Sequence, residues 1–593
     1  MEFIGANMAP IMFAGLICFL LMGFSVAFSL AACGLTFAFI GIEMGLLPAA
    51  LVQALPLRIF GTMQNETLLA IPFFTFMGLI LERSGMAEDL LDTIGQLFGT
   101  IRGGLAYAVI LVGAMLAATT GVVAASVISM GLISLPIMLR YGYDRRLATG
   151  VIAASGTLAQ IIPPSLVLII LADQLGRSVG DLYKGAFIPG FTLVGMYILY
   201  VLVMTILYPN RAPALPLEAR TIREDDGSSG NRSLLVVFLL AVAAGIAFGE
   251  TRPEGTATDE RIVLSMCVGV AVAFTLAVLN RLLRLKLLSR MAERVTFVLI
   301  PPLALIFLVL GTIFLGVATP TEGGAMGAVG ALLMALARKR LNLSLLRQAM
   351  DTTMKLSCFV VFILLGATVF GLAFQGVDGP KWVEHLLSSL PGGQLGFLIV
   401  VNILVFFLAF FLDFFELSFI VVPLLAPVAD KLGIDLVWFG VLLAVNMQTS
   451  FMHPPFGFAL FYLRSVAPTE DYTDRVTKKP IAKVKSSEIY WGAVPFVIIQ
   501  LVMVGLIIAF PGLVGHDTEA ASGIDADKAL QEMVMPGAEP DTSPAPGMEV
   551  PAVPDAGGSV PSADPAPAPA AEEDPMKALQ DAIKEDANKA NKP

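Results

Sequence analysis

Apolar stretches long enough to cross a lipid bilayer follow one another along most of the chain, and they limit the possible folds more than any other feature. A spanning helix needs about 20 mostly apolar residues, and such runs extend from about residue 10 to about residue 514 of the 593 residues. Apolar residues make up 56% of the sequence and charged residues 14%, outside the range of soluble proteins. We therefore predict an all-α polytopic membrane protein without a large soluble catalytic domain.

The charged and metal-binding residues exclude several other classes of function. The net charge of −10 comes largely from the segment 515–593, and no basic groove is apparent, so no nucleic-acid partner is expected. Three histidines are too few for haem or a multi-histidine metal centre, and no organic cofactor is expected. The tail 515–593 is rich in Pro, Ala, Asp and Glu and is predicted to be disordered, with a short polar helix at 576–588 as an option.

Two parts of the chain repeat one pattern at a constant offset of 291 residues. Pro136 aligns with Pro427, the Gly-x-Asp motif at 142–144 aligns with 433–435, and the Pro-Pro pair at 163–164 aligns with 454–455, without a gap. Many transporters contain two copies of one unit inserted in opposite orientations. The constant offset therefore indicates a duplicated unit.

Loop charges indicate that the two copies are inverted. Cytoplasmic loops carry an excess of Lys and Arg. The loop at 140–146 contains three arginines, whereas its counterpart at 430–435 contains two aspartates and one lysine. With the first loop in the cytoplasm, the basic connector at 464–485 is also cytoplasmic, and the tail lies on the other side of the membrane.

Each copy is predicted to begin with a re-entrant hairpin and to continue with a broken helix. The stretches 104–139 and 394–429 have 36 residues each, whereas two full crossings need about 40 residues and a turn. We expect the hairpin tips at 118–121 and 411–416. The broken helices follow at 147–172 and 436–463.

Each broken helix is interrupted where small and polar residues precede a Pro-Pro pair, at 154–165 and at 446–457. Proline lacks an amide donor and clashes with the preceding turn, so the helix unwinds and backbone carbonyls become free. Inside a membrane these carbonyls need partners, and bound Na⁺ is one way to satisfy them. Half-helix N-termini at the same depth would favour an anionic group of a substrate.

Carboxylates at 322, 413 and 416 lie within or beside apolar stretches and suggest specific roles. Asp413 and Glu416 at the second tip suggest a functional role because a carboxylate at the membrane centre is costly; a water-exposed turn or a structural ion pair is the alternative. Glu322 follows Thr319 by three residues, a spacing that favours a helix cap.

The motifs together resemble a known transporter family. The Gly-Tyr-Asp loop at 142–144, Ser-Gly-Thr at 155–157 before Ile-Ile-Pro-Pro-Ser at 161–165, Ala-Thr-Pro-Thr-Glu at 318–322, and Asn446-x-x-Thr449 before Pro-Pro-Phe-Gly at 454–457 are similar to those of the large membrane subunit of tripartite ATP-independent periplasmic (TRAP) transporters, the DctM type. The resemblance covers nearly all of residues 1–514. It implies an elevator-type secondary transporter, not an enzyme, in the bacterial inner membrane.

The resemblance also implies the coupling ion, the partners and the substrates. Transport would be driven by Na⁺, with a four-helix DctQ-type small membrane subunit and a periplasmic DctP-type binding protein as partners. Substrates would be organic acids such as C4-dicarboxylates, oxo acids or sialic acid.

Two sets of site residues follow from carrying the family's motifs onto this sequence. Residues at the breaks and tips are expected to bind sodium, largely through backbone carbonyls: Thr120, Gly121, Ser155, Leu158, Gln160, Asp413, Asn446, Thr449 and Met452. Hydroxyls, amides and helix ends nearby are expected to hold the substrate carboxylate: Ser126, Gly156, Thr157, Ser165, Glu416 and Gln448.

The predicted organisation places two transport-core repeats between helices of a scaffold. The parts are N-terminal scaffold helices at 1–103, repeat 1 at 104–185, connecting and scaffold helices at 186–393 with inserted spans at 233–283, repeat 2 at 394–465, a basic loop and last span at 466–514, and the tail at 515–593.

Two other functions remain open from the residues alone. One is a stand-alone sodium-coupled carboxylate carrier that needs no binding protein. The other is an intramembrane hydrolase in which Asp413 and Glu416 act as acid and base.

Overall fold

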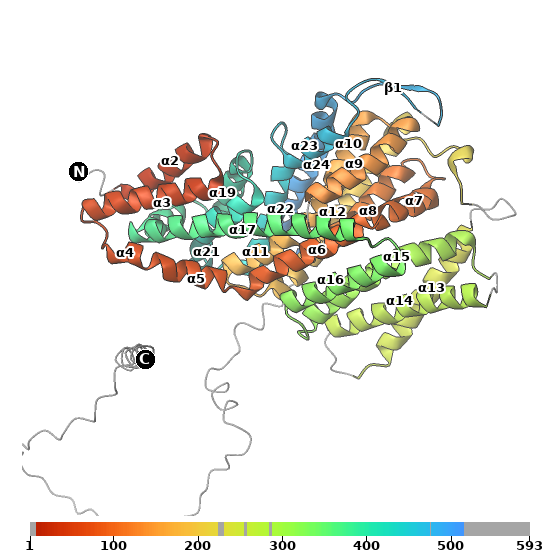
Figure 1. Ribbon diagram of the computed structural model, residues 1–593, viewed down its shortest axis with the longest axis horizontal. Helices are drawn as coiled ribbons and strands as arrows, with labels where there is room; N and C mark the ends of the chain where they lie inside the picture. Colours follow the sequence, from red (N-terminus) through yellow and green to blue (C-terminus); the bar gives the residue numbers. More distant parts are fainter. Residues whose placement is uncertain are drawn as a thin grey trace, which may run out of the picture. The chain divides into compact units, whose positions relative to one another are not determined.

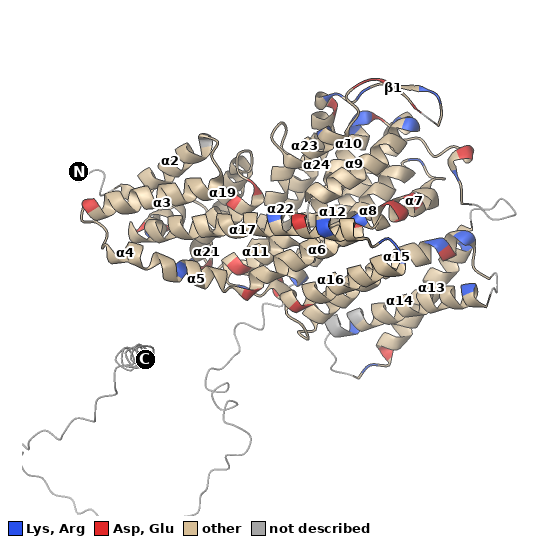
Figure 2. Ribbon diagram, viewed as in Figure 1, with Lys and Arg blue, Asp and Glu red and all other residues tan. Residues whose placement is uncertain are grey.

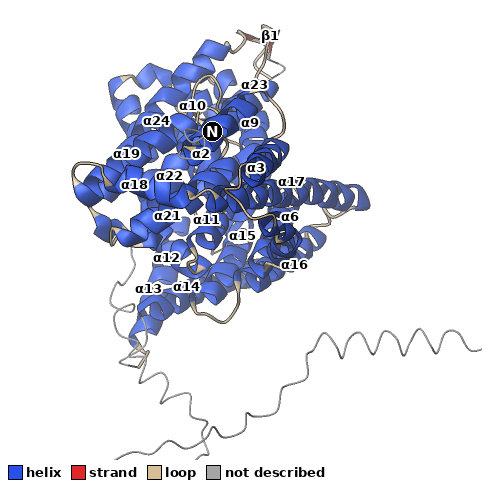
Figure 3. Cartoon of the chain, turned by 90° about the vertical axis from the view of Figure 1, so that its left-hand side faces the viewer, coloured by secondary structure: helices blue, strands red, loops and turns tan. Residues whose placement is uncertain are grey.

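The computed structural model describes residues 7–121, 123–222, 230–253, 258–283, 287–474 and 476–514. The predicted disordered tail and its optional helix at 576–588 lie outside the described residues. Helices form almost all of the described part (Figure 3), and the strands there are β1 (Tyr472–Thr473) and β2 (Pro480–Ile481), which pair antiparallel. Eight described helices are long and apolar enough to cross a membrane, or up to ten if each of two bent pairs forms one span. The prediction of an all-α polytopic membrane protein is confirmed.

The elements before the first repeat are mostly apolar helices. They are α2 (Met8–Leu21), α3 (Val26–Glu43), α4 (Ala50–Gln53), α5 (Leu55–Met63), η1 (Glu66–Leu69), α6 (Ala70–Arg83) and α7 (Met86–Phe98). Between the repeats lie α12 (Val179–Leu207), η3 (Pro209–Arg211), η4 (Leu217–Ala219), α13 (Asn231–Glu250), α14 (Thr258–Leu282), α15 (Arg290–Phe314), α16 (Pro320–Ala337), α17 (Leu343–Gly376) and α18 (Gly379–Ser388). Helix α3 packs along α17 and α6 packs along α16 (Figure 1).

The two repeats have the same order of elements. The first contains α8 (Gly104–Thr120), α9 (Val123–Arg140), α10 (Arg145–Thr157), η2 (Leu158–Gln160) and α11 (Leu166–Leu175). The second contains α19 (Gly393–Leu408), α20 (Phe414–Glu416), the π-helical turn η5 (Leu417–Val421), α21 (Val422–Lys431), α22 (Leu436–Gln448), η6 (Thr449–Phe451) and α23 (Phe458–Val466). After the second repeat and the strands come α24 (Ser486–Ala509) and η7 (Pro511–Leu513).

The start of α10 and the start of α22 are set by the same local chemistry. Asp144 and Asp435 are the N-caps, and each side chain accepts a hydrogen bond from the backbone N–H three residues on, at 3.1 Å and 2.7 Å. Gly142 and Gly433 precede them with φ of 82° and 71°, a backbone conformation that glycine adopts without steric cost. The repeat seen in the sequence is therefore a repeat of structure.

Helix α24 shows that the two copies are inverted. Near its start, Glu488 forms an ion pair with Arg145 at the first-repeat turn, with 3.2 Å between Oε1 and Nη1. Near its end, the backbone oxygen of Ile507 accepts a hydrogen bond from the Trp438 indole at the second-repeat turn, at 3.2 Å. A helix of 24 residues is about 36 Å long, so the equivalent turns lie at opposite ends of one span.

Both hairpins return to the end at which they start. The backbone N–H of Leu105, at the start of α8, donates to the Tyr143 hydroxyl beyond the end of α9, at 3.2 Å. At the second hairpin, Gln394 in α19 donates to the backbone oxygen of Leu432 after α21, at 2.6 Å. The predicted re-entrant hairpins are confirmed.

Charged residues are sparse inside this helical body. Figure 2 shows that most charged residues lie at helix ends and in connectors, while long stretches of the helices have none. The helices α6, α8, α10 and α22 contribute to one continuous buried apolar core.

The predicted cap at Glu322 is confirmed: its backbone N–H donates to the Thr319 hydroxyl at 3.2 Å, and its carboxylate accepts from the Thr319 backbone N–H at 2.8 Å.

Candidate functional site

The two broken helices are interrupted at equivalent positions. Helix α10 ends at Thr157 and α22 ends at Gln448, and each is followed by one 3-10 turn before the chain reaches a Pro-Pro pair with a cis peptide bond. Ser165 then caps α11: its hydroxyl accepts from the Val167 backbone N–H at 3.2 Å and donates to the Gln160 backbone oxygen at 2.6 Å. The predicted breaks are confirmed.

The two breaks meet in the interior of the protein. The Gln448 side chain donates from Nε2 to the Thr157 hydroxyl, with 3.2 Å between the atoms, and both residues are fully buried. The Thr157 hydroxyl in turn donates to the Ala154 backbone oxygen at 2.9 Å. The hydrogen bond between Gln448 and Thr157 therefore connects the C-terminal end of α22 to the C-terminal end of α10.

A buried pair of amide side chains lies within the second repeat. Asn446 in α22 donates from Nδ2 to both the backbone oxygen and Oδ1 of Asn402 in α19, at 2.8 Å each. Asn402 donates to the Leu398 backbone oxygen at 2.8 Å. The second hairpin is thereby fixed to its broken helix next to the break. Asn402 was not predicted from the sequence, although a lone asparagine in an apolar stretch is a visible signal.

Several buried acceptor atoms at the breaks have no hydrogen-bond partner among the described residues. They are Oε1 of Gln160, Oδ1 of Asn446, Oε1 of Gln448 and Oγ of Ser450. Buried polar atoms normally have partners, and each exception needs an explanation. Unpaired oxygens gathered at two helix breaks are a suitable environment for a cation.

Backbone oxygens at the predicted sodium residues already accept hydrogen bonds. The Leu158 oxygen accepts from the backbone N–H groups of Ile161 and Ile162 at 3.1 Å and 3.0 Å, and the Thr449 oxygen accepts from Met452 at 2.8 Å. The Ser155 side chain is also engaged, since its hydroxyl donates to the Ile152 backbone oxygen at 3.0 Å. A carbonyl oxygen has two lone pairs. The Thr449 oxygen accepts the hydrogen bond from Met452, so its second lone pair can bind an ion.

The first hairpin tip lies against the start of α11. Gly121 ends α8 with φ of 58°, and a Cβ atom there would lie 3.1 Å from Cγ of Leu166. In the broken helix, a Cβ on Gly156 of α10 would lie 2.3 Å from Cγ2 of Val127, which is farther along the hairpin in α9. Glycine at both positions allows the hairpin and the broken helix to pack closely.

The second hairpin tip is held by two carboxylates acting on the backbone. Asp413 accepts from the Glu416 backbone N–H at 3.0 Å, and the Glu416 carboxylate accepts from the Asp413 backbone N–H at 2.9 Å. This capping box starts α20 at the tip. From the sequence we expected a functional role, a water-exposed turn or a structural ion pair for these carboxylates. The capping box was not predicted, although the Asp-x-x-Glu spacing indicates one.

A cavity of about 230 Å³ lies where the tips and breaks converge. Its walls come from both hairpin tips, both broken helices and α17. The lining residues are Gly121, Val123, Ala124, Gln160, Leu166, Leu356, Phe359, Asp413, Phe414, Phe415, Phe451, Phe458 and Tyr462. Four interruptions of the fold therefore face one space.

The predicted site residues fall into two groups around this cavity. Gly121, Gln160 and Asp413 line it. The others that the structure describes lie near the breaks or tips without lining it: Ser126, Ser155, Gly156, Thr157, Leu158, Ser165, Glu416, Asn446, Gln448, Thr449 and Met452. The Thr120 side chain lies outside the described part of the structure. The aromatic walls were not predicted.

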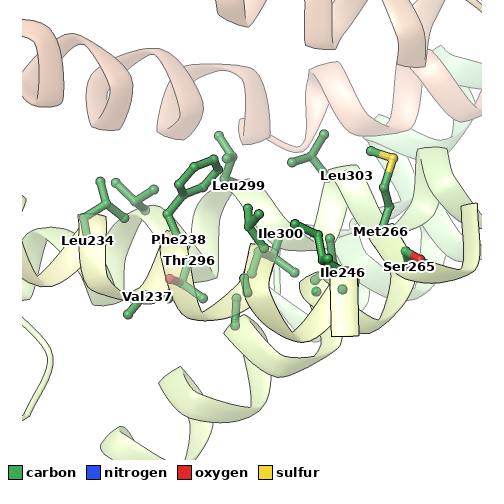
Figure 4. A pocket seen from close by; sticks show the side chains of 17 residues that line it. Leu234, Val237, Phe238, Ile246, Ser265, Met266, Thr296, Leu299, Ile300 and Leu303 are labelled. Atoms are coloured by element: carbon green, nitrogen blue, oxygen red, sulfur yellow. The ribbon is translucent and has the colours of Figure 1, made fainter. Parts of the chain in front are cut away.

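A larger apolar cavity of about 420 Å³ lies elsewhere, between α13, α14 and α15 (Figure 4). Its polar lining side chains are Ser265 and Thr296, and the Thr296 hydroxyl already donates to the Ala292 oxygen at 2.8 Å. Two hydroxyls with no charged or amide side chain are a poor set of ligands for an ion or a carboxylate. The smaller cavity at the breaks is the better candidate site.

Comparison with known proteins identifies the family. Residues 13–513 match the family described as tripartite ATP-independent periplasmic transporter, DctM component. The chain belongs to this DctM family. It is thus the large permease component of a TRAP transporter, a secondary transporter and not an enzyme, and the hydrolase alternative is wrong.

The chain is similar to individual proteins as well. The C4-dicarboxylate TRAP transporter large permease protein DctM of Pseudomonas aeruginosa is 28% identical over 70% of this chain and 81% of that protein. The sialic acid TRAP transporter large permease protein SiaM of Vibrio cholerae is 24% identical over 83% of this chain and 94% of that protein. A solved structure, the YdaH transporter of Alcanivorax borkumensis, matches with a TM-score of 0.46 and 15% identity over 79% of this chain and 90% of that chain.

Proposed function

We propose that this DctM-type permease carries an organic acid across the bacterial inner membrane together with Na⁺. The observation that carries the proposal is the meeting of the two breaks at the Thr157–Gln448 hydrogen bond, beside a cavity that all four interruptions face. In a carrier of two inverted copies, substrate and coupling ion bind where the broken helices meet near the membrane centre.

Sodium is proposed to bind at the breaks. The unpaired oxygens of Gln160, Asn446 and Gln448 support this proposal because a cation would satisfy them without a donor from the protein. Asp413 at the second tip would add a negative charge at the cavity wall. Tip residues Thr120 and Gly121, with the backbone oxygens of Ser155, Leu158, Thr449 and Met452, would complete the ion sites.

The substrate carboxylate is proposed to lie at the start of α11. Ser165 caps this helix, and Leu166 in its first turn lines the cavity. The N-terminal N–H groups of a helix favour an anion. Five of the predicted substrate residues do not line the cavity: Ser126, Gly156, Thr157, Glu416 and Gln448. Their proposed role is therefore to shape and orient the groups that touch the substrate.

Alternating access is proposed to follow an elevator-type movement. The first hairpin packs tightly on its broken helix at Val127 and Gly156, and the second hairpin is hydrogen-bonded to its own at Asn402 and Asn446. The two broken helices are bonded to each other through Thr157 and Gln448, and these contacts favour their movement as one body. Helices such as α3, α6, α16 and α17 would form the fixed scaffold. The proposed partners are a DctQ-type small membrane subunit and a periplasmic DctP-type binding protein, because the family is tripartite.

Uptake into proteoliposomes tests the proposal. The full chain, its small subunit and its binding protein are reconstituted, and uptake of labelled organic acids is measured with external Na⁺ and with Na⁺ replaced by K⁺ or choline. Uptake that saturates and needs a Na⁺ gradient is the expected result. Uptake that is equal in K⁺ contradicts sodium coupling, and full uptake without the binding protein favours the stand-alone carrier.

A further inference from the structure

Aromatic side chains form much of the wall of the cavity at the breaks. Five phenylalanines line it: Phe359 of α17, Phe414 and Phe415 at the second tip, Phe451 of η6 and Phe458 of α23. The rings of Phe359 and Phe415 meet edge to face with 5.9 Å between centroids, and those of Phe414 and Phe415 lie 4.4 Å apart. Aromatic faces and edges at these spacings favour contact with another flat ring.

Polar groups in the cavity are few. Gln160 is 4% exposed, its Oε1 has no partner among the described residues, and it lines the cavity together with Asp413 and Tyr462. No lining residue that the structure describes is a lysine, arginine or histidine. The cavity therefore has no basic side chain to neutralise an anion, and its one charged side chain is a carboxylate.

These groups can satisfy one carboxylate but not two. The Gln160 amide and the first turn of α11 at Leu166 offer polar contacts at one part of the wall, where the Ser165 hydroxyl bonds to the Gln160 backbone oxygen. The Tyr462 hydroxyl lies near enough to Asp413 to be affected by its charge. A second carboxylate would have to face phenylalanine rings, where desolvation of a charge is unfavourable, or Asp413, where like charges repel. A ring or branched apolar body would instead replace water on the aromatic walls.

From this geometry we infer that the substrate has a single carboxylate and a flat apolar body, as an aromatic monocarboxylate has, and is not a C4-dicarboxylate. The inference rests on the proposed function of the same site. It assigns Phe359 and Phe415 to specificity, since they reach the cavity from α17 and from the second hairpin tip. The substrates named for relatives differ among themselves, from C4-dicarboxylate to sialic acid, so membership of the family leaves the substrate class open.

Binding to the permease itself tests the inference without the selectivity of a binding protein. Thermal unfolding of the purified full chain in detergent is followed in Na⁺ with benzoate, phenylacetate or succinate at equal concentrations. The aromatic acids are expected to raise the unfolding temperature, with half-maximal effect at concentrations at least tenfold lower than for succinate. Stabilisation by succinate alone, or by none of the three acids, would overturn the inference.

Variants of the wall test the assigned residues. Phe359→Ala and Phe415→Ala are each expected to raise the half-maximal concentration of phenylacetate about tenfold, whereas Phe407→Ala, on a side chain 61% exposed on α19, is expected to leave it unchanged. Ala124→Lys places an ammonium group at the wall and is expected to improve binding of succinate. Unliganded unfolding temperatures show which variants fold, and unchanged phenylacetate binding in both folded alanine variants would overturn the assignment.

Uptake in the three-component proteoliposomes separates this inference from the proposed function. Sodium-dependent uptake of succinate, with no uptake of phenylacetate, would overturn the inference and support the proposed coupling. Uptake of phenylacetate that is equal in K⁺ would support the inference and contradict the coupling.

Discussion

The Nε2 atom of Gln448 lies 3.2 Å from Oγ1 of Thr157, and the two residues are 291 positions apart, which is the offset of the repeat. Equivalent residues of the two copies are therefore in direct contact. Since the copies are inverted, this contact marks the place where the pseudo-twofold axis passes between the ends of α10 and α22. A site on such an axis is reached equally by both halves of the molecule.

Removing this hydrogen bond should impair transport strongly. In Thr157→Val the Gln448 amide loses its acceptor while buried, and a buried unsatisfied group costs about 1–3 kcal/mol, a range that corresponds to about a 5- to 150-fold change in an equilibrium. We expect the apparent Na⁺ affinity measured by uptake to fall by about tenfold or more. Gln448→Leu should act similarly, and the double variant should be less than additive.

Thr205→Val is the matched control because the Thr205 hydroxyl donates to the Leu202 oxygen of its own helix, at 2.7 Å. It should leave the apparent Na⁺ affinity within twofold of the original value. Equal effects of Thr157→Val and Thr205→Val would show that the contact between the breaks has no part in ion coupling.

The two roles of Asp413 can be separated by substitution. Asn retains an oxygen that accepts from the Glu416 backbone N–H and caps helices about as well as Asp, whereas Ala removes the cap at about 0.5–2 kcal/mol. We expect Asp413→Asn to keep the unfolding temperature but to lose most sodium-dependent uptake, because the charge at the cavity wall is gone. Asp413→Ala should lose both. Normal uptake by Asp413→Asn would limit the residue to a capping role.

Much of the fold is predictable from the sequence because its main constraints are local. Crossing lengths fix the spans, and the constant offset of 291 fixes the register of the copies; accordingly α10 and α22 end at equivalent residues, Thr157 and Gln448. Pro-Pro pairs mark the breaks, since proline cannot continue the hydrogen-bonding pattern of a helix. These signals need no knowledge of distant contacts.

The walls of the cavity could not be predicted in the same way. Phe359 comes from α17, outside both repeats, and an aromatic residue that lines a cavity has the same local sequence as one that faces lipid. With 39 phenylalanines in the chain, only tertiary packing distinguishes the five that line the site. The lone Asn402 and the Asp-x-x-Glu spacing at 413–416 are both visible in the sequence, but neither the contact of Asn402 with Asn446 nor the capping box was predicted.

Close packing between α10 and α24 should make glycine essential at their contact. A Cβ atom at Gly150 would lie 2.1 Å from the Gly492 backbone oxygen, a distance that backbone atoms cannot relieve locally. We expect Gly150→Ala to separate the helices and to destabilise the protein by about 1–3 kcal/mol or more, seen as a lower unfolding temperature in detergent.

Gly195→Ala is the control for this substitution. Gly195 lies inside α12, and nothing lies within 4 Å of a Cβ built there. Alanine favours the helix by about 0.5–1 kcal/mol relative to glycine, so this variant should be as stable as the original chain or more stable. Equal loss of stability in both variants would argue against the close contact of α10 with α24.

The connector before α24 should lose its order only in acid. The Thr477 backbone N–H, the Thr477 hydroxyl and Arg140 all bond to the Asp474 carboxylate, at 2.6 Å, 2.8 Å and 2.9 Å. Led by the Thr477 backbone hydrogen bond, these contacts lower the pKa of Asp474 from 3.8 to about 2. Because the pKa of Asp474 is lower in the folded connector than in the unfolded chain, the ionised carboxylate stabilises the folded connector at pH values above the unfolded pKa of about 4. This stabilisation disappears as the pH falls from about 4 through about 2.

Hydrogen exchange of the connector checks this behaviour. After correction for intrinsic rates, protection of the backbone N–H groups of Val476 and Thr477 should be constant from pH 5 to pH 8 and should fall below about pH 4. Asp474→Asn should reduce it at every pH, because the charge is absent throughout, whereas Glu470→Gln, at an exposed position, should match the original chain. Protection that changes between pH 6 and pH 8 would mean that another group controls the connector.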